Sequence, residues 1–288
     1  MIYLERKFVK MHGIGNDYVY IDCTKQDVSN PNELSVRLSD RHFSIGGDGL
    51  ILIYKSDVAD FRMAMYNNDG SEGKMCGNGI RCVGKFVYDY GLTDKTSISV
   101  ETLSGIKYLD LTLGSDKLVE SVTVDMGKAE IRSGKVPVNL PAVASDDPVI
   151  NKPVEIGGKD YNITCVSMGN PHCIVYMDGI DAMDIETVGR QFEKNEIFPE
   201  WVNTEFVERL DDGSYKMRVW ERGTGETLAC GTGACAVVVS GVLNRFSDHD
   251  QNVTVHLAGG DLDIVYKQNG TVMMNGSAET AFYGFVEI

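Results

Sequence analysis

The segments Glu72-Gly-Lys-Met-Cys76-Gly77-Asn78-Gly79 and Glu226-Thr-Leu-Ala-Cys230-Gly231-Thr232-Gly233 share the pattern E-x-x-x-C-G-x-G. They lie 154 positions apart (230 minus 76), and the same offset relates Gly15-Asn16 to Gly169-Asn170. It also relates Phe61-Arg-Met-Ala-Met-Tyr66-Asn67 to Tyr215-Lys-Met-Arg-Val-Trp220-Glu221. The same offset between three pairs of similar segments indicates an internal duplication. The chain is therefore expected to have two related halves, each presenting one cysteine from the same local structure.

Each cysteine is predicted to lie at the start of a helix. After Cys76, apolar residues recur at helical spacing until Gly91 ends the pattern. After Cys230, the run from Ala234 to Leu243 is apolar almost all round, which predicts a buried central helix. A helix N-terminus stabilises a thiolate, and the Gly-x-Gly that follows lets a ligand carboxylate approach the same backbone N–H groups.

The remaining pattern predicts a mixture of strands and helices. Residues 31–42 are expected to form a helix, with Asn30 as its cap and Pro31 at its first position. Alternating residues from Phe61 to Tyr66 predict a half-buried strand, and residues 96–126 predict hairpins. Residues 134–153 hold four of the seven prolines and are expected to be rich in loops.

Composition limits the classes of partner. The 288 residues carry a formal net charge of −15 and no cluster of lysine or arginine, so nucleic acid and anionic membranes are not expected partners. The first residues lack a signal-peptide pattern and no apolar run approaches the length of a membrane span, which predicts a cytoplasmic protein. Seven cysteines without a CxxC motif favour reduced thiols over disulfides, and no metal site is predicted.

Two matched thiols suit proton transfer at a carbon. Inversion at an amino-acid α-carbon needs a base on one face and an acid on the other, and a thiolate and a thiol can exchange these roles. The alternative is that both cysteines are buried and inert. That alternative is preferred for the other cysteines, which lie within strand or helix patterns: Cys23, Cys82, Cys165, Cys173 and Cys235.

One motif points elsewhere. Gly231-Thr-Gly-Ala-Cys-Ala236 formally matches a dinucleotide-binding fingerprint. The residues before it, Glu221-Arg-Gly-Thr-Gly-Glu226, are loop-like and do not form the strand that this fingerprint requires. The match is therefore weak.

The chain resembles the diaminopimelate epimerase family from end to end. The matching segments are Lys10-Met-His-Gly-Ile-Gly-Asn-Asp17, Asn67-Asn-Asp-Gly-Ser-Glu72, Met75-Cys-Gly-Asn-Gly-Ile-Arg-Cys82, Val166-Ser-Met-Gly-Asn-Pro-His172, Val202-Asn203 and Glu221-Arg-Gly-Thr-Gly-Glu-Thr-Leu-Ala-Cys-Gly-Thr-Gly-Ala-Cys235. The resemblance implies an α/β (α+β) fold of two pseudo-symmetric domains, each a rolled, mostly antiparallel sheet around a central helix. The expected domains are residues 1–120, to which a last strand at 276–288 returns, and residues 121–275.

The resemblance also implies an activity: epimerisation between LL- and meso-2,6-diaminopimelate, without a cofactor such as pyridoxal phosphate, for lysine and bacterial peptidoglycan synthesis. The enzyme is expected to be a homodimer acting on a small molecule. Carried over by position, Cys76 and Cys230 are the acid/base pair, and His172 and Glu221 tune the thiols. The positions expected to bind substrate are Asn16, Asn67, Gly77, Asn78, Asn170, Asn203, Glu221, Arg222, Gly231 and Thr232.

Two positions depart from the family pattern. Gly49 stands where some members carry glutamine, which puts a polar contact from that position in doubt. Asn68 stands where alanine is common, beside the predicted pocket residue Asn67.

Three other functions remain open at this point. Proline racemases and hydroxyproline epimerases resemble this pattern, but they carry histidine in place of Asn78, and their small cyclic substrates leave Glu221 and Arg222 without a role. A cysteine hydrolase could use one thiolate with His172 as base, which leaves the second matched cysteine unexplained. A binding protein without activity predicts that loss of either cysteine leaves ligand affinity intact.

Overall fold

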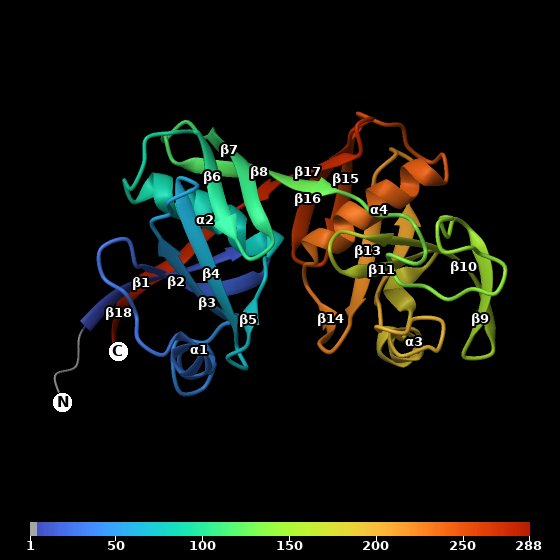
Figure 1. Cartoon of the computed structure of the whole chain (residues 1–288), viewed down its shortest axis with the longest axis horizontal. Helices are drawn as coiled ribbons and strands as arrows, with labels where there is room; N and C mark the ends of the chain where they lie inside the picture. Colours follow the sequence, from blue (N-terminus) through green and yellow to red (C-terminus); the bar gives the residue numbers. More distant parts are fainter. Residues whose placement is uncertain (1–4) are drawn as a thin grey trace. The chain divides into compact units, whose positions relative to one another are not determined.

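The computed structural model describes residues 5–288, which pack as two compact units (Figure 1). One unit comprises the described chain up to Val124 together with Asn275–Ile288, and the other is Asp125–Met274. The chain leaves the first unit within strand β8 (Val119–Lys128) and returns within β17 (Thr271–Ser277). In this described part of the chain, the helices are all too short or too polar to cross a membrane.

The first unit is built around a sheet and two helices. Its chain order is β1 (Glu5–Gly13), β2 (Asn16–Asp22), α1 (Pro31–Ser39), β3 (Gly49–Tyr54), β4 (Phe61–Asn67), β5 (Glu72–Gly73), α2 (Gly77–Asp89), β6 (Ser97–Thr102) and β7 (Gly105–Leu113), followed by β8. The last strand of the chain, β18 (Glu279–Glu287), pairs antiparallel with β1.

The second unit repeats this plan. Its elements are β9 (Lys152–Ile156), β10 (Lys159–Ser167), β11 (Pro171–Tyr176), a short 3-10 helix (Ile180–Ala182), α3 (Ile185–Glu193), β12 (Asn203–Arg209), β13 (Tyr215–Glu221), β14 (Gly225–Thr227), α4 (Gly231–Leu243), β15 (Asn252–Leu257) and β16 (Gly260–Tyr266), followed by β17. The loop-rich stretch predicted before β9 is confirmed, since residues 134–151 hold neither a helix nor a strand.

The repeat extends to strand pairing. In the first unit β2 pairs parallel with β3, β3 antiparallel with β4, and β4 parallel with β6. In the second unit β11, β12, β13 and β15 pair in the same sequence of directions. Helices α1 and α2 reappear as α3 and α4 at the offset of 154 that relates the two cysteine motifs. The predicted α/β fold of two similar halves is confirmed.

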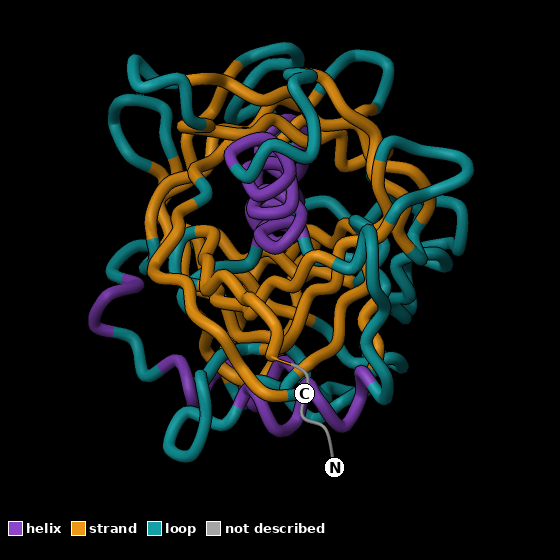
Figure 2. The backbone as a smooth tube through the Cα atoms, turned by 90° about the vertical axis from the view of Figure 1, so that its left-hand side faces the viewer, coloured by secondary structure: helices purple, strands orange, loops and turns teal. Residues whose placement is uncertain are grey.

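A buried helix lies at the centre of each unit. Every residue of α2 from Gly77 to Val87 is buried, and α4 is buried along most of its length, as its apolar sequence predicted. Figure 2, which looks onto the first unit, shows a helix enclosed by strands. Because the sheet surrounds the helix, the N-terminus of each helix is held in a fixed place by the core.

Two local predictions were inaccurate. Helix α1 ends at Ser39 rather than at residue 42, because the Asp40 carboxylate accepts the backbone N–H groups of His42 and Phe43 and turns the chain. Asn30 precedes the helix but makes no side-chain cap bond.

Strand β4 is buried on both faces, although its alternating pattern predicted burial on one. Ala64 and Tyr66 belong to a core cluster with Leu34 and Leu38 of α1. On the other face, Met63 lies against the first turn of α2, close to Gly79. A helix packed on each face hides side chains that alternation alone assigns to solvent.

Candidate active site

Cys76 occupies the N-cap of α2, as predicted. Its backbone is extended (φ −131°, ψ 120°), and its Sγ accepts the N–H of Gly79 at 3.3 Å. The thiol also donates to Asn16 Oδ1 at 3.2 Å. A thiolate at this position would face the positive end of the helix dipole.

A network of charged residues holds Asn16 in place. Asn16 Nδ2 donates to Asp48 Oδ2 at 2.7 Å, and the Arg41 guanidinium contacts both Asp17 (2.7 Å) and Asp48 (2.9 Å). The sequence pattern did not point to Arg41 or Asp48. The sequence feature that could have indicated Asp48 is its position as the carboxylate of the turn Gly46-Gly-Asp-Gly49, which lies between a helix and a buried strand.

Position 49 has no room for a side chain. A Cβ added to Gly49 would lie 2.0 Å from the carbonyl oxygen of Tyr66. The glutamine of some family members could therefore not be placed here without a shift of the backbone. In this chain the preceding residue, Asp48, makes a polar contact to Asn16.

Tyr18 is the buried polar neighbour of Cys76. Burial raises the pKa of Tyr18 well above its ordinary value, and the nearby Cys76 and Asp48 raise it further. The phenol therefore remains protonated at neutral pH, and it can donate a hydrogen bond without supplying charge.

Cys230 occupies the equivalent N-cap of α4. It is only 5% exposed, and its Sγ lies 3.6 Å from Thr232 Oγ1. Burial raises the pKa of Cys230 well above its usual range, and the charges of Glu221 and Glu205 raise it further. Hydrogen bonds from Thr232 and the N–H of Gly233 oppose this without reversing it. In this arrangement Cys230 is a protonated thiol at neutral pH.

His172 and Glu205 form a buried pair next to Cys230. His172 Nδ1 and Glu205 Oε1 are 2.6 Å apart, and both side chains are fully buried. His172 Nε2 lies 3.1 Å from Asn170 Oδ1, and Asn170 Nδ2 donates to Thr232 Oγ1 at 3.3 Å. If Glu205 is ionised, two hydrogen assignments satisfy these contacts: an imidazolium that donates at both nitrogens, or a neutral ring protonated at Nδ1 with the Asn170 amide reversed.

Glu205 was not predicted from the sequence. The signal that could have found it is the carboxylate itself, which interrupts the buried run of β12 from Asn203 to Val207. A charged residue fully buried in a central strand needs a partner, which here is His172.

The same three side chains do not form a metal site as they stand. The ligand atoms of His172, Glu205 and Cys230 lie within 4.8 Å of one another. However, ligands of one tetrahedral zinc ion are separated by roughly 3.3 Å, given metal–ligand bonds of about 2.0 Å. The 2.6 Å between His172 and Glu205 is instead the length of a charge-assisted hydrogen bond.

The other predicted binding residues lie within their own units. In the second unit, Asn203 Nδ2 donates to the Pro171 carbonyl at 2.9 Å, and its Oδ1 accepts the N–H of Arg222 at 3.0 Å. The Arg222 guanidinium donates to the Glu200 carbonyl at 2.9 Å, and Glu221 accepts the Thr227 hydroxyl. The buried Asn203 side chain thus links the start of β11 to the residue that follows β13.

In the first unit, Asn67 Nδ2 donates to Ser71 Oγ at 2.9 Å within its own loop, which also holds the unusual Asn68. Gly77 and Asn78 begin α2, and Gly231 and Thr232 begin α4. Their N–H groups lie in the first turn, where a helix supplies no backbone acceptor of its own.

The other five cysteines are buried, as predicted. Burial raises the pKa of Cys23 to about 11 and that of Cys82 to about 11. It also raises the pKa of Cys173. Cys23, Cys82 and Cys173 therefore remain protonated and are poor nucleophiles.

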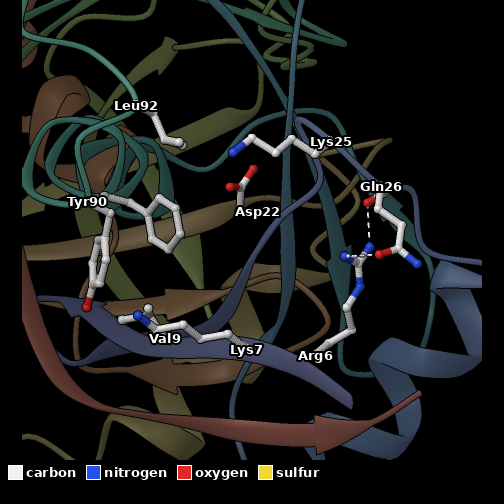
Figure 3. Close-up of a pocket in the computed structure, with 9 residues that line it drawn as sticks. Arg6, Lys7, Val9, Asp22, Lys25, Gln26, Tyr90 and Leu92 are labelled. Atoms are coloured by element: carbon white, nitrogen blue, oxygen red, sulfur yellow. Dashed lines mark hydrogen bonds between the residues drawn. The ribbon is translucent and has the colours of Figure 1, made fainter. Parts of the chain in front are cut away.

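A cavity of about 430 Å³ opens in the first unit, and Cys76 is not among the residues that line it (Figure 3). Its charged groups contact neighbouring residues: Arg6 donates to Gln26, and Lys7 lies over the rings of Tyr90 and Tyr283. Figure 3 shows the Lys25 and Asp22 side chains pointing toward each other. Its lining includes none of the predicted catalytic or binding residues.

Comparison with known proteins identifies the family. The model of the family "Diaminopimelate epimerase" matches residues 8–132 and 164–281. The chain belongs to the diaminopimelate epimerase family. Proteins named diaminopimelate epimerase from Methanococcus maripaludis strain C6 and Acetivibrio thermocellus are 53% and 51% identical to it, over 98% of this chain and 100% and 99% of theirs. The chain is accordingly an isomerase of the epimerase class.

Solved structures share the fold at low sequence identity. A PhzF-family phenazine biosynthesis protein of Bacillus anthracis matches with a TM-score of 0.70 at 16% identity, covering 99% of this chain and 100% of that one. A hydroxyproline epimerase of Agrobacterium vitis matches with a TM-score of 0.69 at 14% identity, covering 100% of this chain and 92% of that one. These two matches show a shared fold, which does not by itself assign a reaction.

Proposed function

We propose that this epimerase interconverts LL- and meso-2,6-diaminopimelate without a cofactor, with Cys76 and Cys230 as the acid/base pair. In the cell it would supply lysine and, in bacteria, peptidoglycan precursors. The observation that carries the proposal is that both thiols occupy the N-caps of equivalent buried helices, α2 and α4. The choice of substrate is supported by relatives named diaminopimelate epimerase, which are about half identical over nearly their whole length.

The proposed step moves one proton out and one proton in. A thiolate removes the α-proton on one face of the carbon, and the C–H electron pair is left on the carbon and its carboxylate. The other thiol then donates its proton to the opposite face, so the roles of the two sulfurs are exchanged after each turnover. The carboxylate would be received by the N–H groups of Gly77, Asn78, Gly231 and Thr232, where helix dipoles favour negative charge.

The electrostatic surroundings support an initial assignment of roles. Because burial and two carboxylates keep Cys230 protonated, we assign it as the acid in the resting enzyme. Cys76, whose Sγ accepts the N–H of Gly79 in the first turn of α2, is assigned as the base. To act as a base, it must first lose the proton that it donates to Asn16 Oδ1. The reverse reaction would require the opposite protonation of the pair.

The distal end of the substrate carries a second amino acid group. We propose that Asn16, Asn67, Asn170, Asn203, Glu221 and Arg222 recognise it. Arg222 can exchange its bond to the Glu200 carbonyl for a stronger one to a carboxylate, and Glu221 can accept from an ammonium group. A cyclic imino acid has no such group, which disfavours a proline or hydroxyproline substrate.

The deciding experiment is deuterium incorporation. Reduced, pyridoxal-free protein is incubated with LL-diaminopimelate in deuterated water, and α-carbon exchange and inversion are followed by NMR. We expect Cys76→Ala and Cys230→Ala each to lower turnover by about 10²- to 10⁴-fold, the usual contribution of a general acid or base. Cys165→Ala, which removes a buried cysteine of β10, is the matched control.

Three outcomes would oppose the proposal. Exchange that survives in both variants would exclude the two-thiol mechanism. Absence of exchange in the wild-type protein would exclude diaminopimelate, and proline and hydroxyproline in parallel tubes would then test the sister activities. Hydrolysis that needs only one of the two thiols would instead indicate a cysteine hydrolase.

We further propose a homodimer formed through β18. This strand presents large exposed side chains: Phe282 is 47% exposed, Tyr283 66% and Phe285 63%. Tyr283 and Phe285 share one face of the strand, whereas Phe282 is on the other face, where it packs against Phe8. Exposed aromatic groups such as Tyr283 and Phe285 are typical of protein interfaces. The double variant Tyr283→Glu, Phe285→Glu should have half the wild-type mass in sedimentation equilibrium. A wild-type protein that is a monomer at micromolar concentration would contradict the proposal.

A further inference from the structure

The two thiols have different neighbours at equivalent positions. The offset of 154 relates Tyr18 to His172 and Ile51 to Glu205. Strand register agrees: Tyr18 pairs with Gly49 two residues before Ile51, and His172 pairs with Asn203 two residues before Glu205. The first unit thus has a phenol and an aliphatic side chain where the second has an imidazole and a carboxylate.

The equivalence holds in space as well as in sequence. A Cβ added to Gly79 of α2 would lie 2.7 Å from Ile51 Cδ1, whereas one added to Gly233 of α4 would lie 2.6 Å from Glu205 Oε1. Ile51 and Glu205 therefore occupy the same place beneath the first turn of their helices. The Cβ added to Gly233 would also lie 3.2 Å from Cys230 Sγ, so the Glu205 carboxylate and the Cys230 thiol both lie beside this glycine.

Core stability does not explain Glu205. The side chain is fully buried, and among the described residues its Oε2 has no hydrogen-bond partner. Removing a carboxylate from water is costly, and a hydrophobic residue in its place is often neutral or stabilising. Ile51 fills the equivalent place in the first unit without that cost, which points to a functional reason for Glu205.

A continuous chain of polar contacts leads from Glu205 to Cys230. Glu205 Oε1 contacts His172 Nδ1 at 2.6 Å, and His172 Nε2 contacts Asn170 Oδ1 at 3.1 Å. Asn170 Nδ2 then donates to Thr232 Oγ1 at 3.3 Å, and Thr232 Oγ1 lies 3.6 Å from Cys230 Sγ. All of these residues belong to the second unit.

We propose that Glu205 is a positioning residue that fixes the orientation and the Nδ1 proton of His172, and through Asn170 and Thr232 holds Cys230 in its working position. Cys76 is instead positioned by Asn16 and Asp48. The two thiols therefore occupy equivalent helix N-caps, but different side chains position them. This inference rests on the proposed two-thiol function, because Glu205 acts through Cys230.

The first test measures the protonation state of the His172 imidazole directly. Protein labelled with 15N in the histidine imidazoles is studied by two-bond 1H–15N correlation NMR, with His172 assigned from the spectrum of His172→Asn. In the wild type we expect a protonated Nδ1 with a strongly downfield proton, as a short bond to a carboxylate produces. Glu205→Gln should move this proton upfield, and Glu205→Ile, which copies the first unit, should abolish the signal.

Glu193→Gln is the matched control. Glu193 is also a buried glutamate of the second unit, but it accepts the Trp220 indole N–H and the Gly223 N–H, both at 2.8 Å, away from the histidine. This variant should lose stability in urea unfolding while the His172 spectrum stays as in the wild type. A His172 pattern that is the same in wild type, Glu205→Gln and Glu205→Ile would overturn the inference.

The second test measures turnover. Glu205→Gln and Glu205→Ile should lower kcat at least tenfold with KM changed less than twofold, because the substrate contacts are retained while Cys230 loses its alignment. Unchanged kcat in both variants would also overturn the inference. A wild-type protein inactive on diaminopimelate would instead reject the proposed function, and the NMR result on the resting protein would remain decisive for His172.

Discussion

At the residue scale, Asp17 connects the fold to the site. Its carboxylate contacts Lys10 Nζ at 2.6 Å and Arg41 Nη2 at 2.7 Å, and Arg41 also holds Asp48, the partner of Asn16. Burial acts to raise the pKa of Asp17, but hydrogen bonds from Arg41 and Lys10 outweigh it, and the net pKa is lowered from 3.8. Asp17 is therefore a charged acceptor under all ordinary conditions.

The sign of this shift predicts a pH-dependent stability. Because the pKa is depressed in the folded state, the contribution of Asp17 is fully present above 3.8 and is lost as the pH falls through the folded value. Asp17→Asn should lower the urea midpoint at pH 7, and the difference from wild type should shrink as the pH falls below about 4. Asp211→Asn, at an exposed turn, is the control. A difference that stays constant from pH 7 to pH 3 would contradict the assignment.

At the element scale, the first turns of α2 and α4 are the features that carry the chemistry. Both helices begin with Gly-x-Gly after a cysteine, yet the environments under their second glycines differ. A methyl group at Gly79 would meet the end of the flexible Ile51 side chain at 2.7 Å. A methyl group at Gly233 would meet Glu205 Oε1 at 2.6 Å and Cys230 Sγ at 3.2 Å. The same substitution should therefore have unequal effects.

We expect Gly233→Ala to lower kcat by about 100-fold, since displacing a reacting group by an ångström can cost that much. Gly79→Ala should cost clearly less, because Ile51 can adopt another rotamer. The two variants are each other's control, and they are compared by kcat and by thermal unfolding. Equal losses of kcat in the two variants would show that the surroundings of the thiols do not differ in the way described.

At the scale of the whole molecule, the first and last described strands, β1 and β18, pair within one unit. Strand β1 lies between β2 and β18, and Phe282 of β18 packs edge-on against Phe8 of β1, with ring centroids 6.0 Å apart. The first unit is thus completed only when β18 has been synthesised. The second unit, Asp125–Met274, is one continuous segment.

Truncation after Ala278 should destabilise the first unit selectively. Loss of β18 exposes Phe8 and the edge of β1, so we expect the melting temperature to fall by about 5 °C or more, as a loss of roughly 2 kcal/mol produces in a protein of this size. Hydrogen exchange should rise in β1 and β2 while residues 125–274 stay protected. A synthetic peptide of residues 279–288 should restore part of the loss. Uniform loss of protection across both units would contradict this prediction.

The sequence determined the repeated local structure. One offset predicted both N-cap cysteines, and the apolar run from Ala234 to Leu243 predicted a buried helix, because helix periodicity and capping are local properties. Alternation predicted β4 as a strand but misjudged its burial, since burial depends on what packs on each face. The helix over residues 31–42 was found, although its end depended on a side-chain bond at Asp40.

Only the tertiary structure decided which side chains surround each thiol. Asp48 is 28 positions from Cys76 in sequence and Glu205 is 25 from Cys230, and neither belongs to a cysteine motif. Strand register places Glu205 beside His172, and the packing of α4 on the sheet places Cys230 above it. Register and packing arise from contacts between distant segments, so a local pattern carries no information about them. The sequence thus determined two equivalent thiols, and the tertiary fold determined that they have different partners.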